Sequence, residues 1–168
     1  PIIVTVRSIK EGGLERFSDR TRAALFEALI PYSDIVDIEL SSNGIIENVV
    51  SSAKSNGKTV IISHHDFKGT PGDAALRDLI KKSREKGADI VKVAAHAGSL
   101  KDLKRLAGIL LGDDGLIIIA MGEKGAASRV FFPMLGSLIT YGSITGKTAP
   151  GQLTLKEIKE AFKKYATA

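Results

Sequence analysis

The sequence predicts an α/β protein built on a parallel sheet, either a barrel or a doubly wound layer. Three observations lead to this fold class. Short aliphatic runs alternate with amphipathic stretches, and the starts of the runs recur at intervals of 22 to 33 residues, the period of a βα unit. Polar side chains also gather toward the carboxyl ends of successive runs. At 168 residues with no evident linker, the chain is expected to form one domain, residues 1–168.

The expected elements follow one another along the chain. Strands are predicted at residues 2–6, 35–40, 59–63, 89–94, 116–120 and 138–142, where aliphatic residues dominate. Amphipathic helices are predicted at residues 14–30, 44–57, 73–87 and 154–166, the last with Thr154 as its N-cap. These alternating elements favour parallel strands connected by helices.

Composition excludes several classes of function. The chain has no cysteine, which removes disulfides, thiol nucleophiles and thiolate metal sites, and its three histidines lack metal-ligand spacing. No apolar run approaches the ~18 residues that span a membrane, and no secretory signal pattern is present, so a cytoplasmic protein is expected. The net charge of +5 comes with only 5% aromatic residues, which disfavours nucleic acid and suits a small anionic substrate.

The two phases of the first four strands differ sharply, because alternate residues of a strand face opposite sides. One phase is aliphatic, as a surface under helices requires: Ile2, Val4, Val6, Val36, Ile38, Leu40, Val60, Ile62, Val91 and Val93. The other phase is polar: Thr5, Arg7, Asp37, Glu39, Ser63, His65 and Lys92. Asp37 or Arg7 alone would suit a structural ion pair, but four strands repeating the pattern predict a shared site at the mouth of a barrel.

Lys92 stands within the apolar run "DIVKVAA". Burial disfavours the charged form of an amine, so the pKa of such a lysine falls, and nearby cations such as Arg7 or His65 would lower it further. A neutral amine attacks a ketone or aldehyde to form a Schiff base, which then acts as an electron sink. The alternative is a structural lysine that is paired with Asp37 or Glu39.

His65, in "SHHDF", is the candidate proton carrier. It shares the phase of Ser63 and the polar face, whereas His64 has the opposite parity and is expected to pack or to support. An imidazole with a pKa near 6.5 takes and returns a proton at neutral pH.

Two later loops follow strands as well: "MGEKGAASR" brings Ser128 and Arg129, and residues 146–152 bring Gln152, in settings that favour an anion.

Six segments in chain order resemble the type I 3-dehydroquinate dehydratases: VTVRSIKEGG, VDIEL, SHHDFKGTP, ADIVKVA, MGEKGAASR and TAPGQL. The resemblance runs from Pro1 to the C-terminal helix. It implies a homodimeric (β/α)8 TIM barrel, a hydro-lyase of the shikimate pathway and of aromatic amino acid biosynthesis. The implied reaction is the syn elimination of water from 3-dehydroquinate to give 3-dehydroshikimate, with neither metal nor dissociable cofactor.

The resemblance also implies roles for individual residues. Lys92 corresponds to the Schiff-base lysine, His65 to the general base and acid, and Glu11 to the carboxylate that orients this histidine, with Asp37 behind it. The resemblance implies substrate contacts, with the carboxylate or the ring of the substrate, for a further set of residues: Arg7, Arg129, Thr148, Gln152 and Met121. Thr148 stands where many relatives carry serine, and it keeps the hydroxyl.

Relative to the family, the chain is expected to lack the first two βα units, because Pro1 opens on what resembles the third strand. Six strands cannot close an eight-stranded barrel. Two other functions remain open on the residues alone. One is another Schiff-base lyase of the class I aldolase type, although no phosphate grip is evident. The other is a non-catalytic, dehydroquinate-binding regulatory module, a kind of protein that tends to lose the nucleophile or base.

Overall fold

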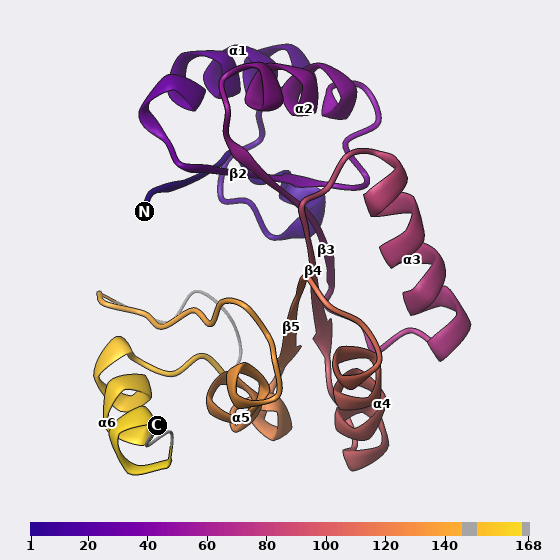
Figure 1. Ribbon diagram of the computed structural model, residues 1–168, viewed down its shortest axis with the longest axis vertical. Helices are drawn as coiled ribbons and strands as arrows, with labels where there is room; N and C mark the ends of the chain where they lie inside the picture. The colour runs from indigo at the N-terminus through magenta and orange to yellow at the C-terminus, as the bar shows by residue number, and fades with distance from the viewer. Residues whose placement is uncertain (146–150, 166–168) are drawn as a thin grey trace. The chain divides into compact units, whose positions relative to one another are not determined.

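The computed structural model describes residues 1–145 and 151–165. It contains five strands, β1 (Ile3–Thr5), β2 (Ile35–Glu39), β3 (Thr59–Asp66), β4 (Ile90–His96) and β5 (Leu116–Met121), which neighbour one another in sequence order (Figure 1). The helices are α1 (Asp19–Leu29), α2 (Ile46–Ser55), α3 (Asp73–Glu85), α4 (Leu100–Leu111), α5 (Ser128–Met134) and α6 (Leu155–Tyr165). Three short 3-10 helices are η1 (Ile9–Glu11), η2 (Ile30–Tyr32) and η3 (Glu123–Gly125). The predicted α/β class with parallel strands is confirmed.

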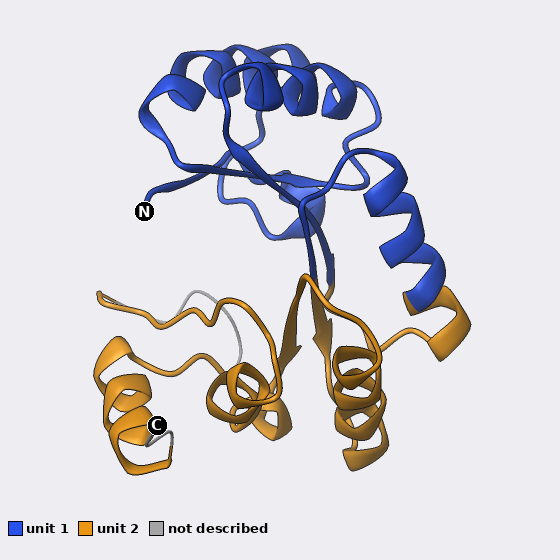
Figure 2. Cartoon of the chain, in the orientation of Figure 1, with its two compact units in different colours: residues 1–65, 77–92 blue, residues 66–76, 93–168 orange. Residues whose placement is uncertain are grey.

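The chain forms two compact units (Figure 2). Unit 1 comprises residues 1–65 and 77–92, and unit 2 comprises residues 66–76 and 93–168. In unit 1, β1 pairs in parallel with β2 and β2 with β3, in a register that sets Thr5 beside Asp37 and Glu39 beside Ser63. This register follows from the pleat, because a slip by one residue would turn the aliphatic phase out of the core.

The core of unit 1 lies between its strands and the helices α1 and α2. Its buried residues include Phe26 and Ile30 from the first helical region, Val36 and Ile38 from β2, and Val60 and Ile62 from β3. Ser18 caps α1 by accepting a hydrogen bond from the backbone of Thr21. The predicted aliphatic phase thus packs under helices, and the polar phase is left for the opposite face of the strands. Ile2 departs from the prediction, because 62% of its surface is exposed.

In unit 2, β5 is buried along its whole length, with α4 and α5 packed against it. A capping box between Ser99 and Asp102 starts α4. Thr154 and Glu157 exchange hydrogen bonds at the start of α6, as expected for an N-cap. No helix within the described ranges is both long and apolar enough to cross a membrane.

The predicted strand at residues 138–142 is wrong. The described part of this segment contains no strand: Leu138 N donates to Leu116 O at the start of β5, but no ladder continues, and the isolated bridge of this region joins Ser143 and Thr154. Side chains take up backbone groups around the segment: the Ser137 hydroxyl accepts from Ile118 N, and Arg129 Nη1 donates to Tyr141 O. Backbone groups bonded in this way cannot join a ladder, so aliphatic composition alone does not make a strand here.

Candidate active site

The polar phase of the unit 1 strands forms one connected cluster. The carboxylate of Asp37 lies at its centre, and its Oδ2 accepts from Lys92 Nζ at 2.9 Å. Its Oδ1 accepts from Arg7 Nη2 at 3.0 Å and from the Ser63 hydroxyl at 2.7 Å. Arg7 Nη1 also donates to Ser63 Oγ at 2.8 Å. Side chains from β2, β3 and β4, together with Arg7 just after β1, therefore share one hydrogen-bond network, as the strand phases predict.

Lys92 is buried, with 7% of its surface exposed, and is paired with a carboxylate. The pairing with Asp37, considered above as the alternative to a free amine, is therefore what the structure contains. Burial lowers the pKa of Lys92, the charge of Asp37 opposes this, and the charge of Arg7 adds to it, with a net lowering. Although burial alone would raise the pKa of Asp37, Lys92 and Arg7 bring it to about 2. Asp37 thus stays ionised while Lys92 releases its proton more readily than an exposed lysine does.

The segment "RSIKEGG" positions the second carboxylate. Ser8 caps η1 by accepting from Lys10 N, and Gly12 ends it with a φ of 91°, which a residue with a Cβ rarely adopts. A Cβ on Gly13 would lie 2.2 Å from Arg7 O, so the loop returns tightly over its own start. This tight turn places Glu11 at the end of η1 with only 6% of its surface exposed.

Glu11 holds His65 at two points. Its Oε2 contacts His65 Nδ1 at 3.0 Å and accepts from the backbone N of His65 at 2.9 Å. Its Oε1 accepts from the Ser41 hydroxyl at 2.5 Å. Burial raises the pKa of Glu11, but the hydrogen bonds from His65 and Ser41 outweigh it and lower that pKa. An ionised Glu11 requires a proton on Nδ1, so Nε2 of a neutral His65 carries the free lone pair.

The electrostatic surroundings keep His65 neutral at physiological pH. Burial lowers its pKa, the hydrogen bond to Glu11 opposes this, and the charges of Arg7 and Lys92 lower it further. A neutral imidazole whose Nδ1 is fixed and whose Nε2 is free is suited to accept a proton. The arrangement provides a base on β3 beside an amine on β4.

The hydrogen bonds of Asp37 go to Lys92, Arg7 and Ser63. Arg7 likewise forms ion pairs with Asp37 and, at 3.2 Å, with Glu39. Asp37 thus supports the lysine directly, its charge also acts to raise the pKa of His65, and its place behind the histidine stays a prediction.

Sequence reasoning missed two residues that hold this cluster, Ser41 and Arg22. Ser63 and Glu39 were predicted on the polar face, but Ser63 was given no partner and Glu39 only Lys92 as an alternative, whereas their hydrogen bonds go to Asp37 and to Arg22. Ser41 follows β2 by two residues and carries no distinguishing signal. Arg22 lies on α1, where a charged side chain would ordinarily face solvent.

The other predicted site residues belong to unit 2. Arg129 is only 4% exposed, and its Nε and Nη1 donate to Gly151 O at 3.1 Å and Tyr141 O at 3.2 Å. No carboxylate of the described chain forms an ion pair with it, and burial lowers its pKa. A buried guanidinium that is held by carbonyls and has no counter-ion among the described residues favours an anion. Met121 and Gln152 are buried as well, and Thr148 lies outside the described residues.

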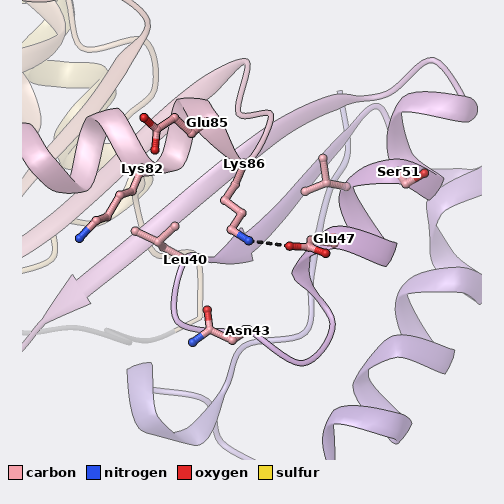
Figure 3. Close-up of a pocket in the computed structure, with 8 residues that line it drawn as sticks. Leu40, Asn43, Glu47, Ser51, Lys82, Glu85 and Lys86 are labelled. Atoms are coloured by element: carbon pink, nitrogen blue, oxygen red, sulfur yellow. Dashed lines mark hydrogen bonds and ion pairs between the residues drawn. The ribbon is translucent and has the colours of Figure 1, made fainter.

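A groove of about 650 Å³ in unit 1 lies elsewhere (Figure 3). It runs between α2 and the end of α3, and an ion pair of Lys86 with Glu47 at 2.6 Å crosses it. None of the predicted site residues lines it. Across the part of the chain that the structure describes, no group of three or more His, Asp or Glu side chains could hold a metal ion.

The family model described as type I 3-dehydroquinase matches residues 1–167. The 3-dehydroquinate dehydratase of Pyrococcus abyssi is 40% identical over 163 residues, covering 96% of this chain and 75% of its own. A crystal structure of 3-dehydroquinate dehydratase from Geobacillus kaustophilus matches with a TM-score of 0.91 at 29% identity, over 99% of this chain and 69% of that chain.

A further match is the type I enzyme of Clostridium difficile, whose structure is described as containing covalently modified comenic acid. It has a TM-score of 0.89 at 30% identity, over 98% of this chain and 68% of that chain. The matches extend over both units and include all the residues of the lysine and histidine cluster. The chain belongs to the type I 3-dehydroquinase family.

Proposed function

We propose that Lys92 forms the Schiff base and that His65 transfers the proton in the dehydration of 3-dehydroquinate to 3-dehydroshikimate. Membership of the family identifies the reaction class: the chain is a hydro-lyase of the shikimate pathway. The assignment of Lys92 and His65 within that reaction rests on their chemistry and surroundings. The observation that carries it is a buried amine on β4 that is close enough for its charge to lower the pKa of His65 on β3. The imidazole of His65 is in turn oriented by the carboxylate of Glu11.

The first step joins the amine to the substrate. The neutral Nζ of Lys92 attacks the C3 ketone, and the carbinolamine loses one water to give the imine. The lowered pKa of Lys92 supports this step because it increases the neutral fraction of the amine. Asp37 and Arg7 hold the surroundings of Nζ in place, and the ionised Asp37 stabilises a cationic iminium once it has formed.

The second step removes the proton and the hydroxyl group. Nε2 of His65 takes a C2 hydrogen, and the electron pair that is left delocalises into the imine as an enamine. The same imidazole then protonates the C1 hydroxyl, which leaves as a second water. Hydrolysis of the product imine consumes one water and restores Lys92, so the cycle releases one water overall. Glu11 supports this step by fixing the tautomer of His65.

The substrate carboxylate belongs with Arg129. Its buried guanidinium, anchored through Nε and Nη1, offers a bidentate donor for an anion. Gln152 and Thr148 are proposed to assist there, Met121 to line the ring, and Arg7 to approach the ring hydroxyls. We further propose a cytoplasmic homodimer that uses no dissociable cofactor, in line with the reaction just described.

Turnover and its loss test the proposal. The product is a conjugated enone, so its absorbance should rise when the chain is mixed with 3-dehydroquinate. Lys92→Ala should abolish this signal, and His65→Ala should let an imine accumulate without product. Near-native turnover by Lys92→Ala would refute the assignment of the nucleophile.

A further inference from the structure

Glu39 is a carboxylate at the end of β2 that is completely buried. Four donors surround it. Its Oε2 accepts from Arg22 Nη2 at 2.5 Å and from Ser42 Oγ at 2.7 Å. Its Oε1 accepts from Ser8 N at 2.7 Å and lies 3.2 Å from Arg7 Nη1. Oε2 thus contacts α1 and the loop after β2, whereas Oε1 contacts the loop after β1.

The contacts of Oε2 with Arg22 and Ser42 hold the Glu39 side chain in place. Arg22 reaches it from α1, donates from Nε to Val6 O at 2.9 Å, and donates from Nη1 to Ser42 Oγ at 3.0 Å. The guanidinium is therefore bonded on three sides, and 4% of its side chain is exposed. Such multiple bonding in a buried setting leaves the Glu39 side chain in one orientation.

The Oε1 side branches toward both halves of the candidate site. One branch, the histidine arm, runs through Ser8, the residue that caps η1, to Glu11 and His65. The other branch, the lysine arm, runs through Arg7 to Asp37 and Lys92. Glu39 Oε1 therefore contacts both Ser8, the first residue of the histidine arm, and Arg7, the first residue of the lysine arm.

We propose that Glu39 is a positioning residue that sets the geometry of the histidine arm and the lysine arm together. The proposal rests on the function proposed above for Lys92 and His65. Glu39 contacts Ser8 and Arg7 directly, so it acts on the two arms through these residues. A single anchored carboxylate would explain how residues from η1, β3 and β4 keep their mutual placement.

The charge and the two acceptor oxygens of Glu39 are both needed. All four of its partners donate, and a glutamine offers one acceptor oxygen and one donor nitrogen. In Glu39→Gln, the amide nitrogen must face either Arg22 and Ser42 or Ser8 and Arg7. Either orientation sets donor against donor and loosens at least one branch, without a change in side-chain size.

The first experiment compares Glu39→Gln with the unsubstituted chain in two rates. Borohydride trapping of the dehydroquinate imine reports the lysine arm, and dehydration after imine formation reports the histidine arm. Both should slow by about tenfold or more, because misplacement by a fraction of an ångström suffices for such losses. The control is Glu47→Gln, the same change at an exposed carboxylate in the groove of Figure 3, which should leave both rates unchanged. A folded Glu39→Gln with both rates within twofold of the unsubstituted chain overturns the proposal.

Ser42→Ala serves if Glu39→Gln does not fold. It removes one donor to Glu39 Oε2 and the hydroxyl that also accepts from Arg22 Nη1, while the charge of Glu39 and its contacts with Ser8 and Arg7 stay. A loosened anchor should slow both imine trapping and dehydration by about threefold or more. Two rates equal to those of the unsubstituted chain would overturn the proposal.

A third measurement separates this inference from the proposed function. The nitrogen chemical shifts of His65 report its tautomer without any substrate. The Nδ1-protonated form should dominate in the unsubstituted chain and give way to a mixture in Glu39→Gln. If borohydride traps nothing in the unsubstituted chain, the proposed function fails; an unchanged His65 tautomer in Glu39→Gln refutes the positioning role of Glu39.

Discussion

Asp37→Asn tests the buried ion pair through the pH dependence of stability. Asp37 is 2% exposed and accepts hydrogen bonds from Lys92, Arg7 and Ser63. Its pKa lies at about 2 in the folded chain against an ordinary value of 3.8. A pKa that is depressed by folding contributes stability above the ordinary value, and this contribution is lost as the pH falls through the folded pKa.

The size of this contribution follows from the two pKa values. A difference of nearly two units corresponds to about 2 kcal/mol in the free energy of unfolding at neutral pH. Asparagine keeps the shape of Asp37 but leaves Lys92 and Arg7 without their shared anion. We therefore expect Asp37→Asn to lose stability at pH 6 by at least this amount, and the gap between the two proteins to narrow by about 2 kcal/mol between pH 4 and pH 2.

Urea unfolding at a series of pH values measures the gap directly. The unsubstituted chain should lose stability more steeply than Asp37→Asn as the pH falls from 4 to 2. Asp37→Asn should also lower the pKa of Lys92, because the anion that favours the ammonium is gone. Imine trapping by Asp37→Asn should therefore stay fast at a lower pH than it does in the unsubstituted chain. Two stability curves that stay parallel from pH 6 to pH 2 would refute the ion pair.

Four further outcomes are expected. Glu11→Ala should slow dehydration about a hundredfold and let the imine accumulate, since His65 loses the acceptor that fixes its tautomer; unchanged turnover would contradict that role. The rate of dehydration after imine formation should keep its acidic limb below pH 6.5, because the pKa of His65 is lowered and the base form persists to lower pH; a limb above 7 would argue against His65. Arg129→Lys should raise the Kd for the substrate about tenfold, because an ammonium cannot replace a planar fork, and equal affinity would remove Arg129 from the anion site. Gly13→Ala should cost roughly 2 to 3 kcal/mol in urea unfolding, since its Cβ would lie 2.2 Å from Arg7 O, whereas Gly72→Ala, which has open space, should stay within about 0.5 kcal/mol; similar losses in both would contradict the tight turn.

The strand phases carried most of what could be predicted about the fold and the site. Alternation alone placed Arg7, Asp37, Ser63 and Lys92 on one face, and the structure joins these four in one network. Period and parity suffice for this because the pleat of a paired strand leaves each side chain only two directions. The parallel register then brings equivalent positions side by side.

What could not be predicted depends on contacts between distant segments. Lys92 had two plausible states, free or paired, and only the position of Asp37 on β2, two strands away, decides between them. Arg22 lies on a helix with a polar pattern, so its burial against Glu39 follows from packing and not from its neighbours in sequence. The segment 138–142 is aliphatic enough for a strand, but hydrogen bonds made by Ser137 and Arg129 occupy backbone groups around it.

Covalent capture of the substrate tests the central claim most directly. The chain is incubated with 3-dehydroquinate and borohydride, digested, and mapped by mass spectrometry. The account predicts one irreversible adduct, on the peptide that carries Lys92, and none in Lys92→Ala. An adduct on another lysine, or turnover with no adduct at all, would contradict it.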